Sequence, residues 1–280
     1  MGSGNWIIDN LNSALEMWNG RLEEIWQLIT TSPENFKGGG IWNVIVGING
    51  GLKAVGYALL VLFFVMGIVK TCGSFAEMKK PELAFKCFIR FALAQAAVTW
   101  GMELMTGAFR VAQGMVTTII DSSGLTAMSA TALPDEMASI IEDVGFIDSI
   151  PLWAVTLIGG LFITVMSFIL IMTVYGRFFR LYIFTALAPI PLATFAGEGT
   201  SFAGKQFIKS YIGVCMEGAV IVLACLIFSA FMSSGSPVLD TNLTPVVMAW
   251  QYIAETIFNM LVLVGLVKGA ERIVRELFGL

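Results

Sequence analysis

The chain has 280 residues, of which 57% are hydrophobic and 13% charged, about half the charged fraction of an ordinary soluble domain. Its mean hydropathy of +0.82 and uncharged runs such as Ser149 to Gly176 exclude a soluble globular enzyme and indicate an all-α polytopic membrane protein. The formal net charge is −4, and the absence of histidine excludes histidine-ligated zinc and a histidine general base. We therefore expect no enzymatic activity, no catalytic residue, no metal and no cofactor.

The first predicted element is an amphipathic helix that begins at Trp6. Apolar residues recur every three or four positions as far as Ile29, with polar and acidic residues between them. This helix is too polar to cross hydrocarbon, so we expect it in the membrane interface or against neighbouring subunits. Ser32 and Pro33 end it, and residues 38–40 form a glycine joint. The sequence thus predicts an interfacial segment, 1–40, followed by one membrane domain, 41–280.

Long apolar stretches in the membrane domain predict about five membrane-spanning helices. Their approximate limits are 44–69, 84–107, 151–176, 211–232 and 246–267. Each is long enough to cross ~30 Å of hydrocarbon at a rise of ~1.5 Å per residue. A further stretch, 181–197, contains Pro189 and Pro191, which remove two amide donors and disfavour a continuous helix. This stretch is either a broken, re-entrant segment or a kinked sixth span.

The distribution of charge favours the re-entrant segment. The loop between the first two spans is basic, whereas residues 121–148 contain acidic residues and no Lys or Arg. The positive-inside rule then places the N-terminus outside, the acidic loop outside and the C-terminus inside the cell. If 181–197 re-enters, 12 of the 16 basic residues lie inside, and only Arg21, Lys37, Lys53 and Arg110 lie outside.

The external acidic loop contains a predicted short surface helix. Met137, Ile140, Ile141 and Val144 share one helical face after a proline and two carboxylates, which suit a helix start. Two interpretations have equal support: the apolar face docks on a partner, or it lies on the bilayer.

Four charged residues fall inside the predicted spans, where each needs a partner or water. Lys53 and Glu103 lie near the outer ends of neighbouring antiparallel spans, so we expect an ion pair between them rather than a pore-lining role. Glu217 and Glu255 have no evident basic partner at their depth. They form either a proton- or cation-handling site or neutral carboxyls bonded to a neighbouring helix. The second interpretation is favoured, because acidic positions do not repeat along one face.

The run from Pro151 to Gly197 includes RFFRLYIFTALAPIPL, which joins a basic anchor to a proline-broken apolar segment. With the later stretch from Lys205 to Cys225, it resembles the TrbL-type polytopic subunits of conjugative type IV secretion systems, especially the small members of Gram-positive-type elements. The resemblance implies a non-enzymatic channel or scaffold subunit in the cytoplasmic membrane that helps single-stranded DNA and its attached relaxase to cross. It also implies a homo-oligomeric ring, five- or sixfold, with other channel subunits, partner ATPases and membrane lipids around it.

Contacts with DNA, if the chain makes them, are expected at the cytoplasmic basic residues, because the acidic external loop would repel phosphate. These residues are Lys79, Lys80, Lys86, Arg90, Arg177, Arg180, Lys205 and Lys209. The favoured alternative is that they are topology anchors near anionic lipid. An alternative function is a stand-alone ion channel or ion-coupled transporter that uses Glu217 and Glu255, although the internal repeat typical of transporters is not evident.

Overall fold

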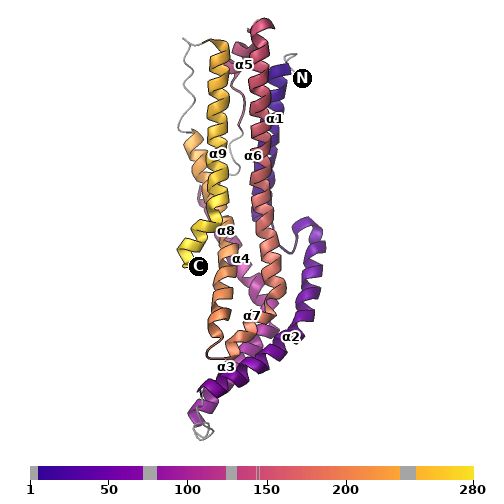
Figure 1. Ribbon diagram of the computed structural model, residues 1–280, viewed down its shortest axis with the longest axis vertical. Coiled ribbons are helices and arrows are strands. Elements are labelled where there is room, and N and C mark those ends of the chain that lie inside the picture. Colours follow the sequence, from indigo (N-terminus) through magenta and orange to yellow (C-terminus); the bar gives the residue numbers. More distant parts are fainter. Residues whose placement is uncertain (1–5, 72–80, 124–130, 143, 145, 234–243) are drawn as a thin grey trace. The chain divides into compact units, whose positions relative to one another are not determined.

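The computed structural model describes residues 6–71, 81–123, 131–142, 144, 146–233 and 244–280. Within these ranges the chain is helical and has no strand, which confirms the predicted all-α class (Figure 1). The elements in chain order are α1 (Trp6–Thr30), η1 (Phe36–Gly39), α2 (Gly40–Thr71), α3 (Pro81–Thr99), α4 (Gly101–Ser123), α5 (Asp135–Glu142), α6 (Phe146–Leu187), α7 (Pro189–Ala193), η3 (Thr194–Ala196), α8 (Ser201–Ser233) and α9 (Pro245–Phe278).

Four helices of the described chain are long and apolar enough to cross a membrane. Their candidate spans are Phe36–Lys70, Ile150–Leu187, Ser201–Phe231 and Val246–Phe278. The predicted span 84–107 is not among them, and the helix there is interrupted at Trp100, which separates α3 from α4. A glycine at position 101 weakens helix continuation there. The protein is thus a polytopic helical membrane protein, and its five-span topology stays a prediction.

Helix α6 extends beyond Gly176, where the third span was expected to end. It continues through Arg177 and Arg180 as far as Leu187. Arginine is a good helix former, so the basic residues that mark a membrane boundary in the sequence do not end the helix. The helix ends where Pro189 and Pro191 follow, and the break predicted from these two prolines is present.

The chain divides into two compact units, which interleave along the sequence. Unit 1 comprises Met1–Thr30, Thr118–Tyr175 and Val220–Ala270, and unit 2 comprises Thr31–Thr117, Gly176–Ala219 and Glu271–Leu280. The expected division into a segment 1–40 and a membrane domain 41–280 stays a prediction, because these units are defined by contacts and not by a bilayer.

In unit 1 the apolar face of α1 packs inside the chain itself. Ile7, Ile8 and Leu11 join a core with residues of α5, α6 and α9. Gly160 of α6 lies against Ala14 of α1. This arrangement differs from the expected contact of α1 with the membrane interface or neighbouring subunits.

Helix α5 contributes to the same core. Met137 and Ile141 are buried, and Ile140 and Val144 pack around them. The predicted helix and its apolar face are confirmed. Both expected roles of that face are wrong, because it packs against α1, α6 and α9 inside unit 1 and not against a partner or the bilayer.

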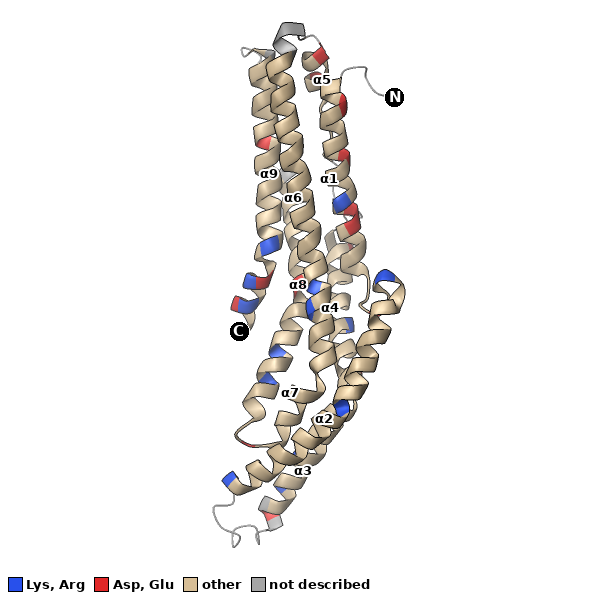
Figure 2. Ribbon diagram, turned by 45° about the vertical axis from the view of Figure 1, so that its right-hand side comes forward, with Lys and Arg blue, Asp and Glu red and all other residues tan. Residues whose placement is uncertain are grey.

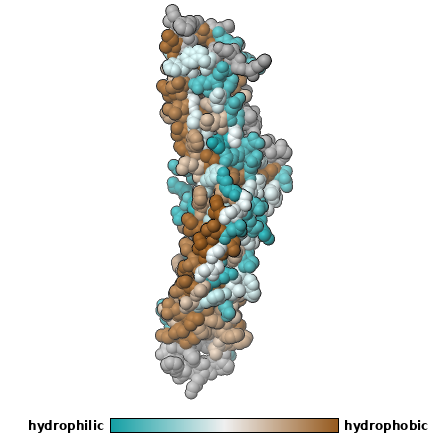
Figure 3. All heavy atoms as spheres, turned by 90° about the vertical axis from the view of Figure 1, so that its right-hand side faces the viewer, coloured by the Kyte–Doolittle hydropathy of each residue, from teal (hydrophilic) through white to brown (hydrophobic). Residues whose placement is uncertain are grey.

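Unit 2 has its own apolar core, which joins α2, α3, α4, α7 and parts of α6 and α8. Outside this core, α2 exposes large apolar side chains along its length, including Val61, Leu62 and Val65. Figure 3 shows such apolar surface, in brown, beside hydrophilic surface on one face of the molecule. Soluble proteins rarely expose contiguous apolar surface on this scale, so lipid or protein must cover α2.

Candidate functional site

The proline break lies inside the core of unit 2. Ala188, Leu192 and Ala193 are buried, and α7 leads through η3 and Gly197 to the start of α8 at Ser201. Irregular backbone at membrane depth is tolerated only where its polar groups find partners. Threonine hydroxyls provide some of them: Thr194 Oγ1 donates to the carbonyl of Pro191 at 2.6 Å, and Thr200 Oγ1 donates to that of Thr194 at 2.8 Å.

Two glycines of α2 let this helix approach the broken segment closely. A Cβ atom at Gly56 would lie 2.9 Å from the carbonyl oxygen of Pro189, and one at Gly67 would lie 3.0 Å from Cα of Gly197. Real Cβ atoms essentially never lie as close as the first contact, so a larger residue at Gly56 would displace the segment, and one at Gly67 would require a shift of a few tenths of an ångström. The broken segment is therefore held by protein in the described structure, on the side that faces α2.

Lys53 also lies on α2, but its partner is not the expected one. Its Nζ donates to the carbonyl of Thr99 at 2.9 Å, at the end of α3. Glu103 is exposed on the first turn of α4, and no ion pair joins it to Lys53 in the described chain. The predicted pair is wrong, because the break at Trp100 leaves terminal carbonyls of α3 that a lysine can cap.

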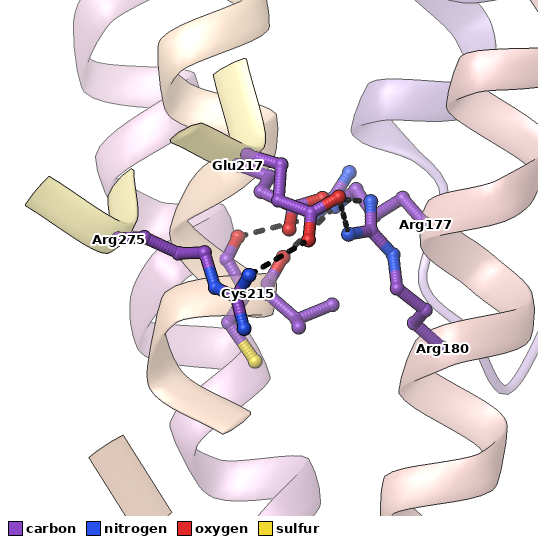
Figure 4. Close-up of polar contacts among 7 residues, drawn as sticks. Arg177, Arg180, Cys215, Glu217 and Arg275 are labelled. Atoms are coloured by element: carbon purple, nitrogen blue, oxygen red, sulfur yellow. Dashed lines mark hydrogen bonds and ion pairs between the residues drawn. The ribbon is translucent and has the colours of Figure 1, made fainter. Parts of the chain in front are cut away.

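A cluster of charged side chains lies between α6 and α8. Arg177 is only 2% exposed, and its Nε and Nη2 donate to the carbonyls of Val214 and Cys215, both at 3.3 Å (Figure 4). Its guanidinium lies 5.6 Å from the ring centroid of Phe109, a cation–π distance. A Cβ at Gly218 would lie 2.7 Å from this guanidinium, so any larger residue there would require the arginine side chain to shift.

Glu217 of α8 is paired, contrary to the sequence-based prediction. Arg180 donates from Nη2 to its carboxylate at 2.7 Å, and the same arginine pairs through Nη1 with Glu271 of α9. Arg275 lies 4.0 Å from Glu271. The prediction missed this pair because it did not foresee that α6 continues as a helix beyond Gly176. The continuous α6 instead carries Arg180 alongside α8.

These charges line a cleft of about 220 Å³ in unit 2. Its wall includes Arg180, Glu217, Glu271 and Arg275, together with the apolar side chains of Phe184 and Val274. In the described residues, no group of three or more His, Cys, Asp and Glu side chains is placed to hold a metal ion. The arrangement cross-links three helices through charge, and it contains mutually paired side chains rather than a nucleophile beside a base.

The other predicted site residues do not join this cluster. Glu255 is exposed on α9 within unit 1. Lys86, Lys205 and Lys209 are exposed on α3 and α8. Figure 2 colours the basic positions of the ribbon blue and the acidic positions red. Arg90 pairs with Glu198 at 3.5 Å. Lys79 and Lys80 lie outside the described residues.

Three of the proposed DNA contacts therefore already interact within the chain, since Arg177 is buried and Arg180 and Arg90 are ion-paired. Sequence reasoning also missed Glu271 and Arg275 as members of the cluster. Their i,i+4 spacing on an amphipathic helix end was the one available signal.

A protein-family comparison decides what kind of subunit contains this site. The model described as TrbL/VirB6 plasmid conjugal transfer like protein matches residues 18–189, more than half of the chain. The chain belongs to the TrbL/VirB6 family. It is thus a membrane subunit of a conjugal transfer, type IV secretion, system and acts with other components of that system. No curated protein and no solved structure matches it.

The TrbL/VirB6 match places part of the site within the family region. It includes α6 with Arg177 and Arg180 and ends at Pro189, the first residue of α7. Glu217 and the rest of α8 and α9 lie beyond it. The resemblance expected from the sequence is confirmed at the level of the family.

Proposed function

We propose that this subunit is a non-enzymatic channel or scaffold component of the cytoplasmic membrane that helps single-stranded DNA, with its attached relaxase, to cross. The family match over residues 18–189 is the observation that carries the proposal. The chemistry of the charge cluster agrees with it. Arg180 and Glu217 neutralise each other, which suits a fixed structural element better than a reactive centre.

The proposal is tested by deleting the gene in frame in its native host and restoring it from a plasmid. We expect deletion to abolish mating and the plasmid to restore it, while growth and membrane potential stay normal. Unchanged mating in the deletion strain would contradict the proposal. A catalytically inactivated relaxase in the same strain is a suitable control for residual transfer.

We further propose that the N-terminus is outside the cell and the C-terminus inside. The supporting observation is the asymmetry of charge, with 12 of the 16 basic residues on the predicted inner side. Reporter fusions after Leu280 test this orientation. A reporter that needs the cytoplasm should be active there, and activity only from a reporter that needs the outside would contradict the proposal.

The partners proposed for this subunit are further copies of itself in a ring, five- or sixfold, other channel subunits, and ATPases that supply energy. The exposed apolar length of α2 provides surface for such contacts or for lipid. Native mass spectrometry of the detergent-solubilised protein tests the ring directly. A single mass of one chain under conditions that preserve known membrane oligomers would contradict it.

The structure gives no added support to a stand-alone channel or transporter that uses Glu217 and Glu255. One carboxylate is paired with Arg180, and the other is exposed in a different unit. Ion flux through vesicles that contain the purified protein, abolished by Glu217→Gln, would reinstate this alternative.

A further inference from the structure

Pro189 leaves a carbonyl group without its helical partner. In an α-helix the N–H group of each residue donates to the carbonyl four residues earlier. Proline has no N–H group, so Pro189 cannot donate to the carbonyl of Thr185. Because Thr185 is buried on α6, water does not reach this carbonyl freely. A buried carbonyl without a donor carries the full cost of its desolvation.

Asn49 of α2 supplies the missing donor. Its side-chain Nδ2 donates to the carbonyl of Thr185 at 2.7 Å, across 136 positions of sequence. Asn49 is itself only 2% exposed, so its amide depends on this partner as much as the carbonyl depends on the amide. Asn49 therefore replaces the hydrogen bond that Pro189 cannot make, although the two residues lie on different helices.

The same face of α2 also reaches the other helix break of unit 2. Lys53, one turn after Asn49, donates to the carbonyl of Thr99 at 2.9 Å. Tyr57, one further turn along, lies with its hydroxyl 3.0 Å from Oγ1 of Thr99. The residues 49, 53 and 57 are spaced at i, i+4 and i+8, which places them on one side of the helix.

The two breaks themselves are in contact. A Cβ at Gly101, directly after the break at Trp100, would lie 2.9 Å from Cδ1 of Leu192 in α7. One strip of α2 thus holds two irregular segments that also touch each other. Displacing either segment would disturb the hydrogen bonds of the other.

We propose that Asn49 is a positioning residue for DNA transfer, which replaces the hydrogen bond lost at Pro189 and so fixes how α7 leaves α6. The role in transfer rests on the proposed function. The replacement by Asn49 of the hydrogen bond lost at Pro189 rests on the geometry alone. This replacement and the role in DNA transfer are tested separately.

The pairing is tested by a double-mutant cycle on the detergent-solubilised full-length chain, with Asn49→Leu, Pro189→Ala and the double variant. Asn49→Leu leaves the buried Thr185 carbonyl without a donor and should lower Tm by about 2–4 °C. Pro189→Ala adds a backbone donor to the same carbonyl, which has two lone pairs and can accept from position 189 and from Asn49 together. In the double variant the backbone donor at position 189 satisfies the carbonyl, so Asn49→Leu should lower Tm less there than in the wild-type background.

Asn43→Leu is the matched control, because Asn43 lies on the same helix and is exposed. It should leave Tm unchanged. If Asn49→Leu lowers Tm equally in the wild-type and Pro189→Ala backgrounds, Asn49 and Pro189 act independently and the inference is wrong.

Mating at matched protein levels tests the positioning role. Asn49→Leu should lower transfer, Asn43→Leu should not, and Pro189→Ala in the Asn49→Leu background should restore it in part. Unchanged transfer in Asn49→Leu, or no restoration in a double variant whose Tm has recovered, would overturn this role. If deletion of the whole gene leaves mating intact, the proposed function fails while the coupling in Tm is unaffected.

Discussion

Unit 1 and unit 2 both bury polar side chains, but of different kinds. The buried polar residues described in unit 1 are hydroxyl groups, such as Thr156 and Ser167, which donate to carbonyls three or four residues earlier in their own helix. Unit 2 buries Asn49, Arg177 and Glu217, which bond to other helices. The hydroxyls need only a helix, whereas the second group needs a particular tertiary arrangement. Changes in unit 2 should therefore be felt across several helices at once.

The largest expected effect is the loss of the partner of Glu217. Arg180→Ala leaves a carboxylate that is 3% exposed without its ion pair, which should lower the free energy of unfolding by about 3 kcal/mol. Thermal denaturation in detergent measures this loss. The control is Arg272→Ala, which removes an exposed ion pair to Glu276 and should cost no more than about 0.5 kcal/mol. Equal losses in the two variants would show that the cluster contributes little.

A smaller loss of stability is expected in unit 1, where the change removes apolar packing and no charge. Met137→Ala leaves a cavity at a fully buried position in the core of unit 1 and should lower the free energy of unfolding by about 2 kcal/mol. Ser139→Ala, on the exposed side of the same helix, should change stability by less than about 0.5 kcal/mol. Faster proteolytic cleavage of Met137→Ala at sites close to α5 in the sequence is the local readout. Cleavage at the wild-type rate would contradict the docking of α5.

The close approach of α2 to the broken segment predicts a difference between two glycines of one helix. Gly56→Ala places a Cβ against Pro189 and should cost about 1–3 kcal/mol. Gly51→Ala meets nothing within 4 Å and should be neutral or stabilise by up to about 1 kcal/mol, because alanine favours helix. Melting temperatures that rank the two variants in the opposite order would refute the packing described for α7.

The smallest effect concerns the joint that precedes α2. Gly38 has φ of +74°, and the Gly38→Ala change forces a side chain into the left-handed region, at a cost of about 1 kcal/mol. Gly40 has φ of −58° and open space around it, so Gly40→Ala should cost nothing measurable. Indistinguishable melting temperatures for the two variants would show that this joint adopts another conformation in solution.

Regular features of the chain could be predicted from the sequence, and tertiary partners could not. The periodicity of α1 and of α5 was enough to predict both helices and their apolar faces, and two prolines were enough to predict the break after α6. The third span was expected to end near Gly176, but charge that marks a membrane boundary does not interrupt backbone hydrogen bonds, and α6 continues to Leu187. Because the continuation of α6 was not foreseen, Arg180 was expected to be a cytoplasmic anchor and was not recognised as the partner of Glu217.

The break at Trp100 was missed for a similar reason. Hydropathy averages over a window, and a one-residue interruption in a chain of apolar residues does not change the average. Which acceptor Lys53 reaches, and which carbonyl Asn49 satisfies, depends on residues 46 and 136 positions away. A one-dimensional pattern contains no such information.

The continuity of α6 sets a limit on where the bilayer can lie. The segment Ile150–Leu187 has 38 residues and, at a rise of ~1.5 Å per residue, measures about 57 Å, nearly twice the ~30 Å thickness of the hydrocarbon core. Along the helix axis, Arg177 lies about 40 Å from Ile150. At the average tilt of ~20°, this corresponds to about 38 Å along the membrane normal. Ile150 and Arg177 therefore cannot both lie in hydrocarbon. If the uncharged first part of α6 fills the core, Arg177 and its partners are at the headgroups, where buried charge is least costly.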